Sequence, residues 1–510
     1  MSALSICSKS FSRFSRTKVR RQRLTKSVVR YKMHAAMIDE ENENFEEFTS
    51  TKVQFSGFSW LHQVAPAFPV DGSKVTVIYE PKDFYTTLLE KCKTAKKRIT
   101  LASLYLGTGK LEQELVKSIR ETVESQSKNV EVNILLDYQR GSRGEINSIH
   151  MLMPMLINDR RKNCKVFFYH TPKLRGYLKE FIPTRFNELI GLQHMKVYLI
   201  DDTLIISGAN LSNDYFNNRQ DRYFMIENSP DLCDFYYKLV KKVTEFSFQL
   251  DSYGGLHYHS DSHPTETSED LFAAEAYQKI HGLLQSEIEQ RSELNASAKS
   301  DTWIFPLVQM AQINLKHDSK ITLKLLENAP AGATLRLATG YFNLTSEYKN
   351  AILKDCQADC HLLTAHPEAN GFYGAKGVAG GIPAAYTKIE KSFFNQCKEL
   401  KQNNRVKLWE FVKTGWTYHA KGLWYSLPGH DKPSLTLIGS PNFGYRSVEK
   451  DLETQIAIVT KNEALQDSLQ KEHKRLFEKA TPVTEKTFTQ KERLPPAWVR
   501  MAVYFFRYYF

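Results

Sequence analysis

The chain has 510 residues, 42% of them hydrophobic, and a formal net charge of +12. This length is enough for two or more domains with their own cores, and the hydrophobic content is ordinary for a soluble globular protein. Residues 1–38 hold ten Lys and Arg residues and no acid, so the rest of the chain carries only +2 (12 − 10). This near-neutral body argues against nucleic acid as a partner, because binding a phosphate backbone requires a basic surface.

The first 38 residues are rich in Arg and Ser and lack a long apolar stretch. This composition is typical of a mitochondrial transit peptide and excludes a secretory signal. The alternative is a disordered basic arm for nucleic acid or nuclear import. Residues 39–55, which include the acidic run 39–47, are predicted to be a disordered linker.

From residue 56 the pattern becomes that of a globular domain. Strands are predicted over residues 74–79, 98–105 and 130–136, with helices over 83–96 and 111–124 between them. This alternation predicts an α/β layer architecture.

The second half of the chain repeats the order of the first. Asn210 is followed after eleven residues by Asp221, and Asn442 is followed after eleven residues by Glu453. Each acid opens an apolar strand, and a helix comes next in both copies. Recurrence of this kind predicts an internal duplication. The polar segment 251–268 and a helix over 269–290 are expected to connect the two copies.

The most informative stretch is residues 193–210, QHMKVYLIDDTLIISGAN. Its pattern predicts a short strand, a turn at Asp201 and a returning strand. Because side chains alternate along a strand, His194 and Lys196 project from one face, and the hairpin brings Asn210 back toward them. An imidazole, an ammonium and a carboxamide at one point suit phosphoryl chemistry.

A partial copy of this stretch lies at residues 418–442 and supplies His419, Lys421, Ser440 and Asn442. Two half-sites in one chain predict one composite active site. The copy lacks the motif Asp, because Ser426 stands where the first stretch has Asp201. If that Asp is mainly a brace for the hairpin, the change affects stability rather than chemistry.

Both stretches resemble the HKD motif of the phospholipase D superfamily. Within it, the chain is most similar to the eukaryotic phosphatidylglycerophosphate synthase family, on SLYLGTG (103–109), LDYQRGSR (136–143), GANLS (208–212) and GSPNF (439–443). The resemblance covers most of residues 56–480. It implies an α/β fold of two phospholipase D-like lobes from an internal duplication, at residues 56–250 and 301–480. Each lobe would be a mixed sheet flanked by helices, with a connector over 251–300 and one composite active site between them.

The resemblance also implies a reaction. Phosphatidylglycerophosphate and CMP would form from CDP-diacylglycerol and sn-glycerol 3-phosphate, on the route to phosphatidylglycerol and cardiolipin, with no cofactor and no metal. His194, whose motif is complete with Asp201, would be the nucleophile, and His419 the general acid and later the base. The phosphoryl oxygens would be held by Lys196, Lys421, Asn210 and Asn442. The carboxylates that orient the two histidines would be Asp221 and Glu453.

Further binding residues are suggested by position. Arg140 and Arg143 follow a strand end and fit a second phosphate on the acceptor, although an exposed basic loop is an equal alternative. Ser440 is a third candidate for binding substrate. Gly107, Gly109 and Lys110 resemble part of a nucleotide-phosphate loop, but the full pattern is absent, and a plain strand-to-helix turn is the alternative.

The tail over residues 481–510 ends in LPPAWVRMAVYFFRYYF, which is too short and too charged to span a bilayer. Its aromatic and Arg residues suit a membrane interface, and an aromatic helix packed on the body is the alternative. No apolar window of 18 residues occurs elsewhere, so we expect peripheral contact with the inner mitochondrial membrane. The Gly-rich loop 367–383 suits phosphate binding, a moving lid or a flexible insertion.

Metal binding is not expected from the remaining motifs. Seven scattered cysteines favour reduced thiols, and Cys356 and Cys360 lack a second pair with matching spacing. His257, His259 and His263 lie in a polar connector and are expected to be solvated.

Three alternatives to the expected reaction stay open. They are a phospholipase D-type nuclease or phosphodiesterase, a CDP-diacylglycerol transferase that uses serine or phosphatidylglycerol, and a non-catalytic membrane scaffold, which Ser426 keeps in consideration. The sequence leaves the oligomeric state open.

Overall fold

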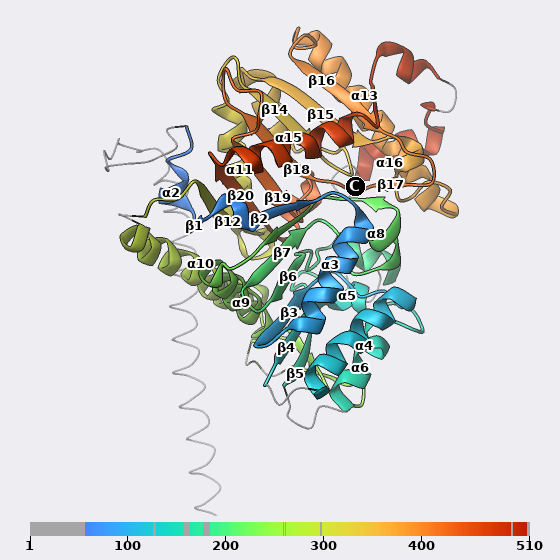
Figure 1. The fold of residues 1–510 in the computed structure, drawn as a ribbon. Coiled ribbons are helices and arrows are strands. Elements are labelled where there is room, and N and C mark those ends of the chain that lie inside the picture. Colours follow the sequence, from blue (N-terminus) through green and yellow to red (C-terminus); the bar gives the residue numbers. More distant parts are fainter. Residues whose placement is uncertain are drawn as a thin grey trace, which may run out of the picture.

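The computed structural model describes residues 57–125, 129–157, 163–176, 184–258, 260, 262–295, 298–490 and 493–506. The predicted transit peptide and the acidic linker lie outside these residues. The described chain forms two lobes, each built on a large mixed sheet with helices against it (Figure 1).

The first lobe is built on a sheet of strand order β11-β10-β5-β4-β3-β6-β7-β9-β2. Strands β3, β4 and β5 are parallel, whereas β6, β7, β9 and β2 are antiparallel to their neighbours. The strands are β2 (Val75–Ile78), β3 (Arg98–Ala102), β4 (Glu131–Asp137), β5 (Cys164–Tyr169), β6 (Val197–Ile200), β7 (Thr203–Ser207), β9 (Tyr223–Ile226), β10 (Phe248–Leu250) and β11 (Leu256–His257). The helices of this half are α3 (Pro81–Thr94), α4 (Lys110–Ser125), α5 (Tyr138–Gly141), α6 (Ser148–Ile157), α8 (Asn213–Asn217) and α9 (Pro230–Thr244).

The second lobe is built on a sheet of order β1-β12-β20-β19-β18-β14-β15-β16-β21, with β13 paired to β12. Its strands are β1 (Phe68–Val70), β12 (Thr302–Met310), β13 (Leu315–Lys316), β14 (Thr334–Ala338), β15 (Asp359–Ala365), β16 (Val406–Phe411), β18 (Gly422–Ser426), β19 (Leu435–Gly439), β20 (Leu452–Thr460) and β21 (Ala480–Pro482). The remaining helices are α2 (Leu61–Val64), α10 (Glu269–Leu294), α11 (His317–Glu327), α12 (Ser346–Asn350), α13 (Ile382–Glu399), α14 (Tyr445–Glu449), α15 (Glu463–Phe477) and α16 (Ala497–Phe506).

The two sheets repeat one topology. The order β5-β4-β3-β6-β7-β9-β2 in the first corresponds to β16-β15-β14-β18-β19-β20-β12 in the second, with the same parallel and antiparallel pairs. The predicted α/β architecture of two duplicated lobes, each a mixed sheet flanked by helices, is therefore confirmed.

One segment departs from the expected division of the chain. β1 lies within residues 56–250, but Phe68 and Val70 pair with Ile304 and Thr302 of β12 in the second sheet. A short ladder between β8 (Arg219–Gln220) and β17 (Thr417–Tyr418) also joins the two lobes. These two strand pairings join the lobes and fix their relative placement.

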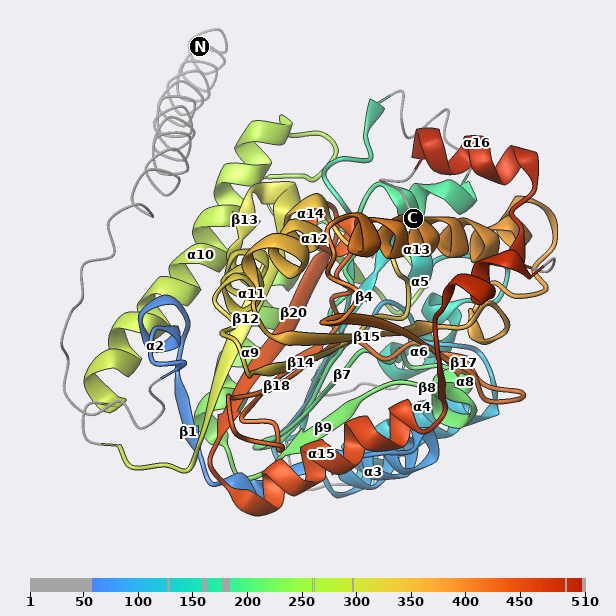
Figure 2. The same cartoon turned by 90° about the horizontal axis from the view of Figure 1, so that it is seen from above.

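The sheets also share a core, because side chains alternate between their two faces. Leu199 and Ile206 of the first sheet belong to the same buried cluster as Val308 and Ile456 of the second. The opposite faces have separate cores, under α3, α4 and α6 in one lobe and under α11, α12 and α13 in the other. Figure 2 shows the two lobes from above, with α10 along one side and α13 and α16 together at another.

Candidate active site

Each lobe presents its His-x-Lys stretch just before a hairpin strand. His194 and Lys196 precede β6, and His419 and Lys421 precede β18. The backbone N–H of His194 donates to the carbonyl of Leu452, 2.7 Å away. That of His419 donates to the carbonyl of Gln220 at 2.8 Å. Each histidine is therefore held at the backbone by a segment of the opposite lobe.

The carboxylates are exchanged between the lobes in the same way. Glu453, from the second lobe, lies 3.0 Å from Nδ1 of His194 in the first. Asp221, from the first lobe, lies 2.6 Å from Nδ1 of His419 in the second. A carboxylate at Nδ1 holds the proton on that nitrogen and leaves Nε2 for chemistry. The two predicted acids therefore do lie against the two predicted histidines, in a crosswise arrangement.

Both imidazoles favour the neutral form. Burial lowers the pKa of His194 and of His419 well below the ordinary value, and the lysine of the same motif lowers each pKa further. Positive charge on His194 also contributes to the lowered pKa of His419, so the two rings lie within electrostatic range of each other. Neutral imidazole is the form that can attack phosphorus.

The two lysines are buried beside the histidines. Nζ of Lys196 donates to the carbonyl of His194 at 2.6 Å, and Nζ of Lys421 donates to the carbonyl of His419 at 2.7 Å. Burial lowers the pKa of both lysines, while Glu453 raises that of Lys196 and Asp221 raises that of Lys421. Two cations and two carboxylates thus share one buried site, where an added phosphate anion would gain strongly from the cations.

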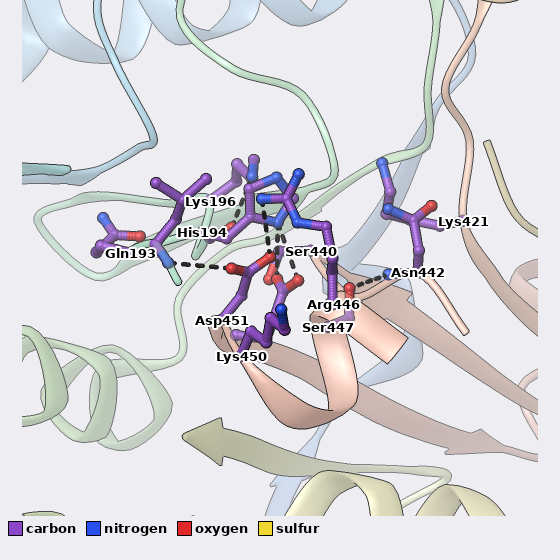
Figure 3. A network of polar contacts seen from close by, with 12 residues as sticks. Gln193, His194, Lys196, Lys421, Ser440, Asn442, Arg446, Ser447, Lys450 and Asp451 are labelled. Carbon is purple, nitrogen blue, oxygen red and sulfur yellow. Dashed lines mark hydrogen bonds and ion pairs between the residues drawn. The ribbon is translucent and has the colours of Figure 1, made fainter. Parts of the chain in front are cut away.

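The two asparagines are also near the hairpins. Asn210 is buried, and within the described chain its Oδ1 has no hydrogen-bond partner. The Oδ1 of Asn442 accepts from Thr339, and its backbone N–H donates to Ser447. Figure 3 shows Asn442 and Lys421 across from His194 and Lys196.

Ser440 contacts the strand that carries Glu453. Its hydroxyl donates to the carbonyl of Thr454 and accepts from the N–H of the same residue, both at 3.1 Å. Hydrogen bonds from Ser440 and Ser447 also lower the pKa of Glu453, although burial raises it more. Ser440 is fully buried and helps to position Glu453, and its predicted contact with substrate stays a prediction.

Asp201 is not brought to the catalytic cluster. It lies at the distant turn of the hairpin, with a φ of 53°, and its carboxylate accepts from the backbone N–H groups of Lys96, Lys97 and Arg98. The prediction that Asp201 is a catalytic residue is therefore wrong. Its carboxylate ties the β6–β7 turn to the start of β3. Ser426 ends β18 and interacts with the carbonyl of Asp431 at 3.5 Å, so the second hairpin lacks the same brace.

The structure also contradicts the prediction of a nucleotide-phosphate loop at residues 107–110. The Glu112 carboxylate fills the loop of Gly107 and Gly109, so closely that a Cβ at either glycine would contact its oxygens. The same carboxylate accepts the backbone N–H of Asn213 at 2.5 Å. An internal carboxylate occupies the position that a phosphate would need, and Lys110 begins α4 at an exposed position. The plain strand-to-helix turn is the correct interpretation.

Arg140 and Arg143 extend from the strand end as predicted, and both contact Glu188. Arg140 also lies over the ring of Tyr105, 4.6 Å from its centroid. The carboxylate of Glu188 and the neighbouring hydroxyl groups of Tyr105 and Tyr215 raise the pKa of Arg140 against the effect of burial. Arg140 therefore lies on the side of the site that carries Tyr215, whereas Arg143 is held farther out by Glu188.

Other residues of the site were missed by sequence reasoning. The hydroxyl of Tyr215 lies 3.4 Å from Nε2 of His419, and Arg219 lies over the Tyr215 ring at 4.7 Å. Arg446 donates to Asp451 and to the carbonyl of Glu188, and its Nε has no partner within the described chain. One signal was available, since Tyr215 and Ser447 each stand five residues after a motif asparagine.

One group of residues has the spacing of a metal site. The ligand atoms of His194, Asp451 and Glu453 all lie within 4.8 Å of one another, and they form the sole such group in the described chain. Lys196 and Arg446 place positive charge beside these atoms, which opposes cation binding. The residues therefore fit a positioned imidazole better than a metal. Cys356 and Cys360, 3.6 Å apart and buried, belong to no such group.

The duplicated mixed sheets and the paired His-x-Lys hairpins define a two-lobed protein of the phospholipase D class. Residues 88–245 match the family described as cardiolipin synthase, PLD-like domain. The chain belongs to the family of CDP-diacylglycerol–glycerol-3-phosphate 3-phosphatidyltransferases. It is 44% identical to the mitochondrial member from Gallus gallus, over 87% of this chain and 85% of that protein.

Other relatives agree with this assignment. The mitochondrial member from Homo sapiens is 44% identical over 87% of this chain and 84% of its own length. The member from Saccharomyces cerevisiae is 35% identical over 82% of this chain and 85% of its own length. Among solved structures, phosphatidylserine synthase from Haemophilus influenzae matches with a TM-score of 0.66 over 88% of this chain and 95% of that one, at 18% identity. This last likeness concerns the fold alone.

Proposed function

We propose that the chain is a phosphatidyltransferase that makes phosphatidylglycerophosphate and CMP from CDP-diacylglycerol and sn-glycerol 3-phosphate. The names of its relatives indicate the two substrates. The observation that carries the proposal is the crosswise pairing of His194 with Glu453 and of His419 with Asp221. Two oriented imidazoles in one site are what a double displacement at phosphorus requires.

In the first step Nε2 of His194 attacks the phosphorus that carries diacylglycerol. The bond from this phosphorus to the bridging oxygen of CMP breaks, and Nε2–H of His419 protonates that oxygen. The negative pyrophosphate raises the pKa of His419 while bound, since an anion stabilises imidazolium, and Asp221 stabilises it further. CMP then leaves, and the phosphatidyl group remains on His194.

In the second step a hydroxyl of glycerol 3-phosphate attacks the same phosphorus. His419 now accepts the proton of that hydroxyl, and the P–N bond to His194 breaks. Throughout, Lys196 and Lys421 would hold the non-bridging oxygens that gain charge in the transition state. Asn210 and Asn442 would complete this set, and no step requires a bound metal ion.

The acceptor differs from other alcohols by its phosphate. Three arginines are candidates for binding this phosphate: Arg219 and Arg446, which act on the two histidines, and Arg140, which lies near Tyr215. Arg219 and Arg446 contribute directly to the electrostatics of His419 and His194 respectively. A guanidinium presents a planar pair of donors that matches a phosphate. We therefore assign recognition of the acceptor phosphate to Arg140 together with Arg219 or Arg446, and Arg143 to the rim.

The cellular setting belongs to the same proposal. Relatives are named mitochondrial, and we propose that residues 1–38 direct the chain to that organelle, where it acts on the inner membrane from one side. Among the described residues, no helix has the length and apolarity needed to cross a bilayer.

The test is a transfer assay with several acceptors. Purified protein is incubated with CDP-diacylglycerol in detergent micelles and with glycerol 3-phosphate, serine or phosphatidylglycerol, and CMP release is followed. CMP release that depends on glycerol 3-phosphate is the expected result. Release that depends on serine or phosphatidylglycerol instead, or cleavage of single-stranded DNA without CMP release, would refute the proposed acceptor.

A further inference from the structure

Exposed apolar side chains gather in two segments of the second half of the chain. Tyr373 and Val378, in the Gly-rich loop 367–381, are 61% and 60% exposed. Trp498 and Met501, in α16, are 44% and 63% exposed. Exposure of large apolar side chains to water is unfavourable in free energy. A cluster of such side chains therefore marks a surface that binds a membrane or another protein.

The two segments meet in the fold. A Cβ at Gly381 would overlap the ring of Trp498, so only glycine allows the helix to pack this closely on the end of the loop. On its other face α16 buries Val499 and Val503 in a small cluster with Ala385 of α13. Figure 2 shows α16 beside α13 at one edge of the molecule. We call the loop 367–381 and α16 together the apolar edge.

The apolar edge continues inward to the catalytic centre. The ring of Tyr341 lies 5.9 Å from that of His419 and 6.1 Å from that of Phe372 in the loop. Tyr386 of α13 stacks on Tyr341 at 5.5 Å. A series of aromatic rings therefore connects the reacting imidazole to the exposed loop.

The apolar edge carries more cations than acids. Its loop contains Lys376 and one acid, Glu368, and α16 contains Arg500 and no acid. Aromatic residues interspersed with cations are the composition of segments that enter the interface of an anionic bilayer.

We propose that the apolar edge is the membrane-docking surface of this protein, with an anionic bilayer as its partner. This inference rests on the proposed function in one respect, namely that the donor substrate is a lipid of the bilayer. Extraction of two acyl chains into water is unfavourable, so the enzyme gains if the donor reaches the histidines while its chains remain in lipid. The aromatic series from Phe372 to His419 gives the donor a route from the bilayer to the site.

The experiment is co-sedimentation of the full-length protein with vesicles of phosphatidylcholine, with or without phosphatidylglycerol. Two double variants test the surface, Tyr373→Ser with Val378→Ser and Trp498→Ser with Met501→Ser. The matched control is Tyr253→Ser with Leu294→Ser, because these side chains are also exposed but lie outside the apolar edge. Each test variant should bind vesicles about tenfold less tightly, since interfacial binding follows the apolar area inserted. The control should bind like the wild type, and phosphatidylglycerol should strengthen wild-type binding.

A second measurement separates this inference from the proposed function. CMP release in detergent micelles does not require a bilayer, so the test variants should keep wild-type rates there. Vesicle binding that is equal in the wild type and both test variants overturns the docking surface, whatever the rate of CMP release. A change of oligomeric state in the test variants without a change in vesicle binding also overturns it, in favour of a second copy of the chain. Absence of CMP release with normal vesicle binding refutes the proposed function and leaves the surface standing.

Discussion

The substitution Asp221→Asn isolates the contribution of one exchanged carboxylate. Asp221 is buried, lies 2.6 Å from Nδ1 of His419, and lies 3.6 Å from Nζ of Lys421. Asparagine keeps nearly the same shape but loses the negative charge, so it no longer stabilises imidazolium at His419. The histidine would then protonate the CMP oxygen more slowly in the first step.

The magnitude follows from the geometry. Two unit charges 2.6 Å apart interact by about 6 kcal/mol at an effective dielectric constant of about 20, which is an upper limit for the lost stabilisation. Loss of about half of this, ~3 kcal/mol, corresponds to a fall in kcat of roughly a hundredfold. Binding of glycerol 3-phosphate does not involve this carboxylate, so KM should change little.

The assay is CMP release at saturating glycerol 3-phosphate, with circular dichroism and size-exclusion chromatography to verify folding. Asp234→Asn is the matched control, because this carboxylate pairs with Arg98 in the same lobe and is largely exposed. The control should keep the wild-type kcat. A folded Asp221→Asn variant with a kcat within about threefold of the wild type would refute the crosswise mechanism.

Three further predictions follow from the site. His419→Ala should accumulate a covalent phosphatidyl adduct with CDP-diacylglycerol, detectable by intact-protein mass spectrometry, whereas His194→Ala should form none; the reverse pattern would exchange the two roles. Asp201→Ala should lower the free energy of unfolding by about 2–3 kcal/mol, because three backbone N–H groups lose their acceptor, and should leave kcat unchanged. A thermal melt and the CMP assay check this pair of effects, and a large loss of kcat at an unchanged melting temperature would contradict the assignment of Asp201 as a brace. Treatment with EDTA should leave CMP release unaffected, since Lys196 and Lys421 supply the positive charge, and a loss restored by added Mg²⁺ would disprove that part of the mechanism.

Local patterns were enough to predict much of the fold. Helices α3 and α4 and strands β2 and β4 lie within two residues of their predicted bounds, because hydrophobic periodicity is set by neighbours along the chain. The repeat of asparagine followed by an acid after eleven residues likewise revealed the duplication. These features depend on short stretches of residues, so they can be recognised in one amino-acid sequence without an alignment.

Features that depend on the meeting of distant segments could not be predicted. The spacing of the motifs does not predict that Asp221 pairs with His419 rather than with His194, because this pairing depends on how the lobes face each other. The carboxylate of Glu112 fills the Gly107–Gly109 loop. The glycine motif by itself does not show that a side chain of the same protein occupies the loop. Arg446 was missed for a similar reason, since its role appears only when Asp451 and Glu188 are brought beside it.

The exchange of carboxylates has a consequence for the duplicated lobes. A single lobe holds a histidine and a carboxylate, but its carboxylate belongs to the histidine of the other lobe. The backbone bonds from His194 to Leu452 and from His419 to Gln220 cross the interface in the same way. Each imidazole is therefore oriented only when both lobes are docked, and a change that separates them by one or two ångströms would remove both carboxylates from hydrogen-bond range together. Burial of the shared core and the exchange of β1 keep this from happening, so the stability of the lobe interface and the orientation of the catalytic groups are one property of the fold.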